Sequence, residues 1–211
     1  MPDTDRLAPD QCAGDRAARV PVRRNMSASG SGPVETTRAG DRTGRNGNGG
    51  VEMIDGPFFG LVVAGILGTG LVAGVFCGFS TFVMRGLAAL PPAQGVAAMN
   101  AINVAAVRPA FMALFAGSAV LSALIAVVTF VVWPGEGKVE LLLGSALYLI
   151  GSFGLTIVAN VPRNERLAGL TPGGPEADGY WPVYVREWTL WNHVRTVASA
   201  AASLVYLLAL A

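Results

Sequence analysis

Four uncharged, mostly apolar stretches follow one another along the chain after its first quarter. They cover residues 58–84, 110–135, 141–162 and 196–211. A helix that crosses the hydrocarbon core of a bilayer needs about 20 residues at a rise of about 1.5 Å each, so the first three stretches are long enough. The pattern predicts an all-α fold, a four-helix transmembrane bundle with spans at about 58–84, 110–133, 141–161 and 192–211.

The fourth stretch is the shortest of the four. Its 16 uncharged residues would rise only about 24 Å as a helix. To cross a membrane, the helix must therefore begin near Asn192, which places His193 and Arg195 at the membrane interface. Pro182 can open this last helix, which we expect to run from about residue 182 to the C-terminus.

The connections between the spans differ in length. Two consecutive prolines, Pro91 and Pro92, can end one helix and start another. Residues 92–106 then predict a short, mildly amphipathic helix that lies on the bilayer surface or dips into it. The short connection 134–139 makes the second and third spans antiparallel neighbours, and the loop 163–181 is longer.

Residues 1–56 have a different character. They hold 16 of the 29 charged side chains and no aromatic residue. Such a segment cannot bury enough surface to offset the entropy lost on ordering, so it predicts a disordered tail ahead of a membrane domain at 57–211. An alternative is that translation starts later, at Met26 or Met53.

Composition excludes several classes of protein. Charged residues make up 14% of the chain, against about 25% in soluble domains, which favours a multi-pass protein of the cell membrane with lipid around it. A net charge of +1, with no basic face outside the tail, argues against binding to nucleic acid. Two cysteines and a single histidine without a nearby acidic or sulfur partner predict neither a disulfide scaffold nor a metal site.

Small residues recur on two of the predicted spans. Gly70, Gly74 and Gly78 are spaced by four on the first span, and Ser199 and Ser203 do the same on the fourth. Such stripes let helices approach closely. We expect them to pack helices within the bundle, and self-association into a homo-oligomer is the alternative.

Polar groups at membrane depth are costly, so each one is a candidate for function. Three clusters stand out: Asn100 with Asn103, residues 160–164, and residues 188–195. They belong to the two loops on the same side of the predicted bundle. We therefore expect them to converge into one pocket at the interface.

Helical rotation sorts the third cluster. At about 100° per residue, Trp188, Asn192 and Arg195 share one face, whereas His193 points roughly opposite to Arg195. His193 and Arg195 therefore cannot both reach one small group unless the helix is distorted or the ligand is broad.

Each polar cluster also has a structural interpretation. Asn160 can cap the third span, Arg195 can extend to the interface, His193 can be a hydrogen-bonded structural residue, and Asn100 and Asn103 can face water. Five aromatic residues can form a belt at the lipid headgroups: Tyr180, Trp181, Tyr184, Trp188 and Trp191.

An ordered set of motifs resembles the anthrone oxygenase family, whose members are small four-span membrane proteins. The resemblance covers about residues 57–211. It rests on GVFCGFSTFVM at 74–84, on Leu90-Pro91 with Gly95, Met99 and Ile102-Asn103, on NVPRN at 160–164, and on WTLWNHVRT at 188–196.

The resemblance implies a cofactor-independent oxygenase. Such an enzyme converts the central methylene of an anthrone, a tricyclic aromatic polyketide, into the carbonyl of a quinone. Dioxygen is the co-substrate, and neither flavin nor metal is expected. The protein need only bind a flat apolar substrate, remove a proton and stabilise an oxyanion.

The resemblance also suggests roles for the polar clusters. His193 would be the general base, with Arg195 and Asn192 stabilising the oxyanion. Trp188 and Trp191 would stack on the rings, and three asparagines would orient the substrate: Asn103, Asn160 and Asn164. The alternative is a non-catalytic membrane protein that binds a lipid or a small apolar molecule, or an accessory subunit. Transport is disfavoured because no acidic residue lies within a predicted span.

Overall fold

The computed structural model describes residues 56–132 and 135–211, and every regular element in these two ranges is helical, which confirms the all-α class. The predicted disordered tail lies, up to residue 55, outside the described residues. The elements are α1 (Gly56–Gly78), η1 (Phe79–Val83), α2 (Met84–Ala88), α3 (Pro92–Ala106), α4 (Pro109–Val131), α5 (Lys138–Tyr148), η2 (Leu149–Gly154), η3 (Thr156–Asn160), α6 (Val161–Ala168) and α7 (Pro175–Leu208).

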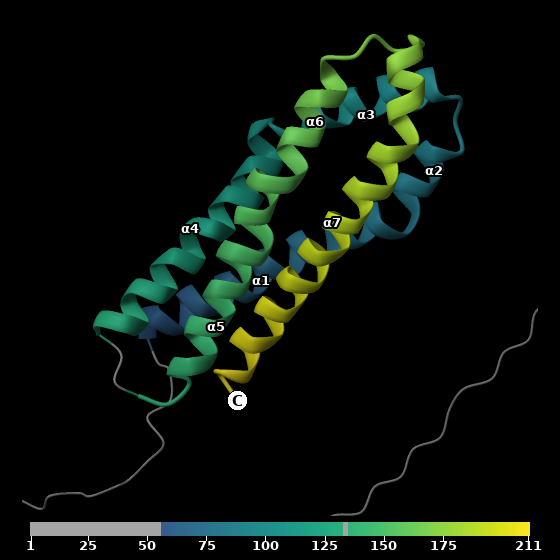
Figure 1. The fold of residues 1–211 in the computed structure, drawn as a ribbon. Coiled ribbons are helices and arrows are strands. Elements are labelled where there is room, and N and C mark those ends of the chain that lie inside the picture. Colours follow the sequence, from purple (N-terminus) through teal and green to yellow (C-terminus); the bar gives the residue numbers. More distant parts are fainter. Residues whose placement is uncertain (1–55, 133–134) are drawn as a thin grey trace, which may run out of the picture. The chain divides into compact units, whose positions relative to one another are not determined.

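These elements form four long helical bodies that lie alongside one another (Figure 1). The first comprises α1, η1 and α2, the second is α4, the third runs from α5 through α6, and the fourth is α7. The labels η mark π-helical segments, in which the turn is wider than in an α-helix. At one end of the bundle, α3 packs against α7 and α6.

Some predicted boundaries hold and others do not. The short helix α3 has the predicted bounds, 92–106, and the second and third bodies pack together as expected. The third body, however, continues through Pro162 to Ala168, and α7 already begins at Pro175, with Pro182 in its interior. The predicted loop 163–181 therefore shrinks to a turn at 169–174.

Local chemistry explains both differences. Pro162 is the second residue of α6, which follows the π-helical segment η3 directly, and the wider turn relieves the clash between a proline ring and the preceding turn of an α-helix. Pro175 occupies the first turn of α7, where a missing N–H costs nothing. Gly173, with a φ of +80°, supplies the left-handed residue that the connecting turn requires.

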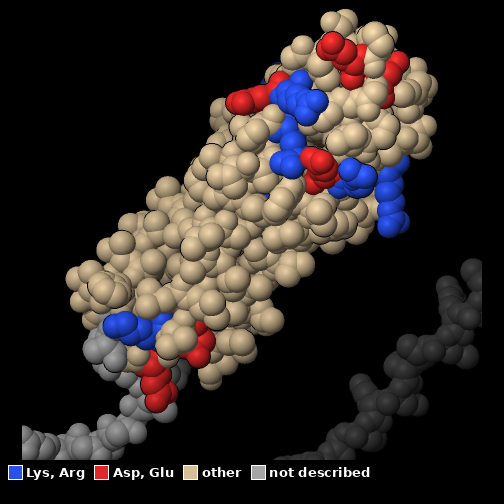
Figure 2. All heavy atoms as spheres, in the orientation of Figure 1, with Lys and Arg blue, Asp and Glu red and all other residues tan. Residues whose placement is uncertain are grey.

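Three of the four bodies are long and apolar enough to cross a membrane: Gly56–Ala88, Pro109–Val131 and Lys138–Ala168. Figure 2 shows the charged side chains gathered towards the two ends of this face, with an uncharged band between them. The fourth predicted span, at 192–211, does not reach the same hydropathy and stays a prediction. Its polar residues Asn192, Arg195 and Ser199 are buried inside the bundle, so they lower the mean hydropathy without touching lipid.

The helices approach closely at glycines, although mostly not at the predicted ones. A Cβ added at Gly144 would lie 2.7 Å from the Tyr206 ring, and one at Gly65 would lie 2.7 Å from Cδ1 of Ile125. Of the predicted stripe, only Gly70 faces another helix. Its neighbour there is Ser203, whose hydroxyl donates to the carbonyl oxygen of Ile66 at 2.9 Å.

The predicted aromatic belt at the headgroups is wrong for four of its five members. Tyr180, Trp181, Tyr184 and Trp188 are buried along α7. Trp181 and Trp188 stack against the ring of Tyr184, and Tyr180 contacts it edge-on. They form the core of the end of the bundle where α2, α3, α6 and α7 meet. This aromatic cluster holds α3 against the long helices, and one of its members, Trp188, lines the cavity described next.

Candidate functional site

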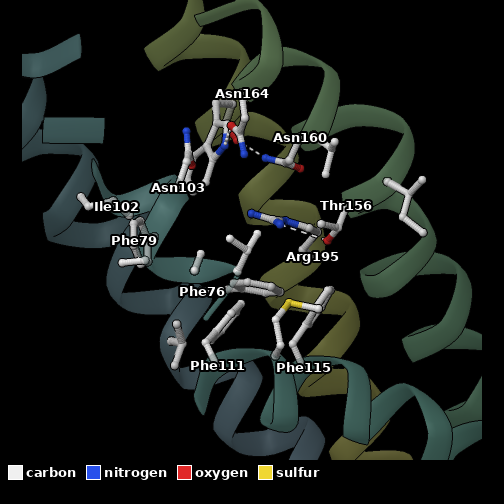
Figure 3. A pocket seen from close by; sticks show the side chains of 18 of the residues that line it. Phe76, Phe79, Ile102, Asn103, Phe111, Phe115, Thr156, Asn160, Asn164 and Arg195 are labelled. Atoms are coloured by element: carbon white, nitrogen blue, oxygen red, sulfur yellow. Dashed lines mark hydrogen bonds between the residues drawn. The ribbon is translucent and has the colours of Figure 1, made fainter. Parts of the chain in front are cut away.

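A cavity of about 500 Å³ lies between α1, α3, α4, the third body and α7. This volume is within the range of small-molecule sites, roughly 300–1,000 Å³. Its wall is largely apolar and carries a few polar side chains. Figure 3 shows Asn103, Asn160 and Asn164 near one end, Phe111 and Phe115 near the other, and Arg195 between them.

The aromatic end of the cavity is built from phenylalanines of different helices. Phe111 and Phe115 of α4 stack at a ring-centroid distance of 5.7 Å. Phe115 also contacts Phe76 of α1 and Phe153 of η2, at 5.9 and 5.3 Å between centroids. Flat, apolar walls of this kind suit an aromatic ligand.

Among the described residues that line the cavity, Arg195 is the only charged one, and it is just 4% exposed. Its guanidinium carbon lies 4.2 Å from the centroid of Phe76 and 5.3 Å from that of Trp188. Among the described residues, no carboxylate pairs with Arg195, and the nearby salt bridge of Glu187 is made with Arg163 instead. The alternative in which Arg195 extends to the interface is therefore wrong.

Neutral oxygen atoms hold the guanidinium in place. Arg195 donates from Nη2 to Oδ1 of Asn192 at 2.6 Å and from Nη1 to Oγ1 of Thr156 at 3.0 Å. Asn192 in turn donates from Nδ2 to the carbonyl oxygen of Phe76 and to Oγ of Ser80, both at 2.7 Å. Asn192 thus ties α7 to the first body and fixes Arg195 without neutralising its charge.

Two asparagines of the third body join it to α7. Oδ1 of Asn164 accepts hydrogen bonds from the Tyr184 hydroxyl at 2.8 Å and from Nε1 of Trp188 at 2.9 Å. Asn160 donates from Nδ2 to the carbonyl oxygen of Trp188 at 3.4 Å, within a continuous helical body, so it does not cap a helix end as the structural interpretation proposed.

Several buried polar atoms of the wall have no hydrogen-bond partner among the described residues. They are Nδ2 of Asn103, Oδ1 of Asn160 and Nε of Arg195. Buried polar atoms are rarely left unpaired, so a ligand or water is expected to complete them. Asn103 is half-buried and lines the cavity, so it does not face water from a surface helix. Its neighbour Asn100 also has a buried oxygen without a partner.

The structure brings all three predicted polar clusters to this cavity, but not every predicted residue. Asn103, Asn160, Asn164, Trp188 and Arg195 line it, and Asn192 supports Arg195 from behind.

Trp191 lies outside the cavity, with the guanidinium of Arg163 5.9 Å from its ring centroid. His193 is exposed on the outer surface of α7. The rotation argument had placed His193 opposite Arg195, and the positions agree with it. His193, predicted as the general base, and Trp191, predicted to stack on the substrate rings, therefore do not face this cavity.

Sequence reasoning missed the apolar half of the wall and Thr156. A phenylalanine in a span gives no sequence signal that separates cavity lining from helix packing. The π-helical segments gave no signal either, although residues of η1, η2 and η3 all line the cavity. Such segments are rare and concentrate at functional sites.

Comparison with known families gives a match over part of the chain. The model of the family described as anthrone oxygenase matches residues 110–205, which are 96 of the 211 residues. Over this region the chain is similar to the anthrone oxygenase family, and three of its helices are long and apolar enough to cross a membrane. No curated protein and no solved structure gives a significant match.

The region matched by the anthrone oxygenase model contains much of the polar wall. It includes Asn160, Asn164, Trp188 and Arg195, together with the aromatic end of α4. The first body and α3 lie before it and contribute Phe76 and Asn103. The cavity is thus formed jointly by the matched region and the preceding helices.

Proposed function

We propose that this protein is a multi-pass oxygenase of the cell membrane, with α7 as its fourth span. It oxidises an anthrone-like tricyclic aromatic to a quinone with dioxygen and requires neither flavin nor metal. One observation carries this proposal: a buried guanidinium without a carboxylate partner lies in a cavity that is otherwise largely apolar and aromatic. Such a site favours a flat aromatic molecule that carries an acidic oxygen.

The chemistry requires little from the protein. Loss of a proton from the central methylene gives an anion delocalised over three rings, with much of its charge on oxygen. This anion passes one electron to dioxygen, and the resulting radical and superoxide combine into a peroxide at the former methylene carbon. Loss of water leaves the carbonyl, so one oxygen atom enters the quinone and the other leaves as water.

Arg195 is the group that would stabilise the anion. Preorganised donors in a site shielded from water act strongly on developing negative charge. Asn192 and Thr156 hold the guanidinium in position, and the unpaired Nδ2 of Asn103 is available to a further ligand oxygen. Trp188 and the phenylalanines would contact the rings.

No obvious base accompanies Arg195. The described residues that line the cavity include no carboxylate, histidine, lysine or cysteine. We therefore propose that the phenolic tautomer of the substrate loses its proton to water, and that Arg195 retains the resulting anion. In this proposal His193 takes no part, because it lies on the outer surface of α7.

The lack of a base also favours a second candidate function. The same cavity could hold an anionic aromatic molecule without transforming it, as a non-catalytic binding protein would. Both functions require Arg195 for binding, and only the oxygenase consumes dioxygen.

The decisive assay uses the purified protein in lipid nanodiscs with 1,8-dihydroxyanthrone under ¹⁸O₂. We expect quinone formation above the spontaneous rate, with one labelled atom in the new carbonyl. Arg195→Met should lower turnover by about 100-fold or more, as loss of an oxyanion donor does. Arg186→Met, at an exposed arginine of the same helix, and His193→Ala should retain activity.

Two results would contradict the oxygenase. Equal turnover by wild type and Arg195→Met would contradict the proposal that the guanidinium stabilises the substrate anion. Binding of the anthrone by wild type without any acceleration of its oxidation would leave the non-catalytic function instead.

A further inference from the structure

The cavity opens on one side of the bundle. Most of its lining residues are buried or half-buried, and four are exposed: Ala105, Val107, Ile157 and Val161. The first two lie at the C-terminal end of α3 and just beyond it, and the other two lie on η3 and at the start of α6. We call the space between these two pairs the α3–α6 opening.

The rim of the α3–α6 opening is entirely apolar. Val107 is 70% exposed, Ile157 54% and Val161 37%. Ile157 and Val161 belong to the candidate span Lys138–Ala168, so their exposed surface is of the kind that faces hydrocarbon. A mouth that faced water would gain nothing from four apolar rim residues.

Charged residues mark where the hydrocarbon ends. Arg108 directly follows Val107 and is exposed, and Arg163 follows Val161 by two positions. Arginines at the ends of spans lie at the level of the lipid headgroups. The opening is therefore at the edge of the hydrocarbon layer, just below the headgroups.

The polarity of the cavity matches that of a molecule dissolved in this layer. An aromatic with one anionic oxygen keeps the oxygen among the headgroups and its rings in the hydrocarbon. In the cavity, Asn160 and Asn164 lie towards the Arg163 end of the third body, whereas Phe111 and Phe115 lie within the candidate span Pro109–Val131. Such a ligand could enter sideways without turning over.

We propose that the cavity takes its ligand laterally from the bilayer, through the α3–α6 opening. This rests on the proposed ligand class, a flat apolar molecule with an acidic oxygen, and not on its oxidation. The bilayer then serves as the solvent from which the ligand binds, so its concentration in lipid, rather than in water, sets the rate of binding.

The test measures binding of 9-anthracenecarboxylate, a fluorescent and redox-inert probe, to the full chain in nanodiscs by stopped flow. Ile157→Trp and Ala105→Trp narrow the opening from its two sides. Association and dissociation rate constants should both fall by about tenfold, with the dissociation constant changed less than about twofold. The matched control is Ile150→Trp, on the same helical body, exposed and outside the cavity lining.

A change that merely fills the cavity would behave differently, because it would weaken binding by speeding dissociation. Rates unchanged in both tryptophan variants would overturn lateral entry and leave the proposed ligand class intact. A wild-type protein without saturable binding would overturn both.

Discussion

Replacing Arg195 by methionine tests the charge of the cavity directly. Methionine is shorter and uncharged, so the change removes the guanidinium and its contacts with the rings of Phe76 and Trp188, and it keeps an apolar side chain at this position. The two probes are 9-anthracenecarboxylate and the neutral 9-anthracenemethanol, which differ in charge and little in shape. Wild type should prefer the carboxylate because the buried guanidinium has no carboxylate partner in the described part of the chain.

The size of the effect follows from the contacts of Arg195. Its Nε is buried and unpaired, so one charge-assisted hydrogen bond to the ligand is available without breaking those to Asn192 and Thr156. Such a bond contributes about 1.5–3 kcal/mol, and each 1.4 kcal/mol is about tenfold in affinity. Arg195→Met should therefore weaken carboxylate binding by about 10- to 150-fold and leave binding of the alcohol nearly unchanged.

Binding is measured by fluorescence titration in nanodiscs, with thermal unfolding as the control for folding. Arg195→Lys keeps the charge but loses the fork of donors, so it should recover part of the preference for the carboxylate. Added methylguanidinium should restore binding in Arg195→Ala, where it can occupy the vacated space. Equal affinity of wild type for the two probes, or an unchanged preference in the methionine variant, would refute the reasoning.

Two further changes test the wall and its support. Asn164→Asp keeps the oxygen that accepts two hydrogen bonds but adds a negative charge to the cavity. The variant should retain the fold, and its affinity for 9-anthracenecarboxylate should fall more than its affinity for the alcohol. A larger loss of affinity for the alcohol would contradict this prediction. Gly95→Ala would place a Cβ 2.6 Å from Cζ2 of Trp181. Such overpacking should lower the free energy of unfolding by about 1–3 kcal/mol. Gly86→Ala is its matched control, since nothing lies within 4 Å of that position, and equal stability of the two variants would contradict the tight packing.

Much of the fold could be predicted from the hydrophobic pattern, because long apolar runs have few alternatives to a helix in a membrane. The errors lie where a proline was taken to mark the end or the beginning of a helix. Pro162 and Pro182 both lie within helical bodies. Proline costs the chain one hydrogen bond and a steric clash, and a neighbouring π-helical segment, such as η3 before Pro162, relieves the clash. Where the backbone widens in this way depends on the surrounding packing, which single-sequence patterns do not encode.

The polar half of the site was predictable for a related reason. In a chain with so few charged residues after its tail, a polar side chain in a span must be paired, solvated or bound to something, so Asn103, Asn160 and Arg195 could be singled out before any coordinates. Rotation about α7 then separated Arg195 from His193. The pattern could not predict which polar groups are hydrogen-bonded within the protein and which have no partner, since hydrogen bonding across helices depends on which helices are neighbours.

The separation of His193 from Arg195 decides between two kinds of chemistry. A histidine in the cavity would have supplied a base, and the substrate could then have been bound neutral. Arg195 is the single charge among the described residues that line the cavity, and its hydrogen-bond partners are neutral oxygens, so the proposed chemistry relies on a negative charge that the ligand brings or acquires by losing a proton to water. An apolar wall strengthens this attraction, because a charge in a medium of low polarity is poorly screened. In the proposed function, the apolar wall that contacts the rings of the ligand thus also strengthens the preference of this one guanidinium for an anionic ligand over a neutral one.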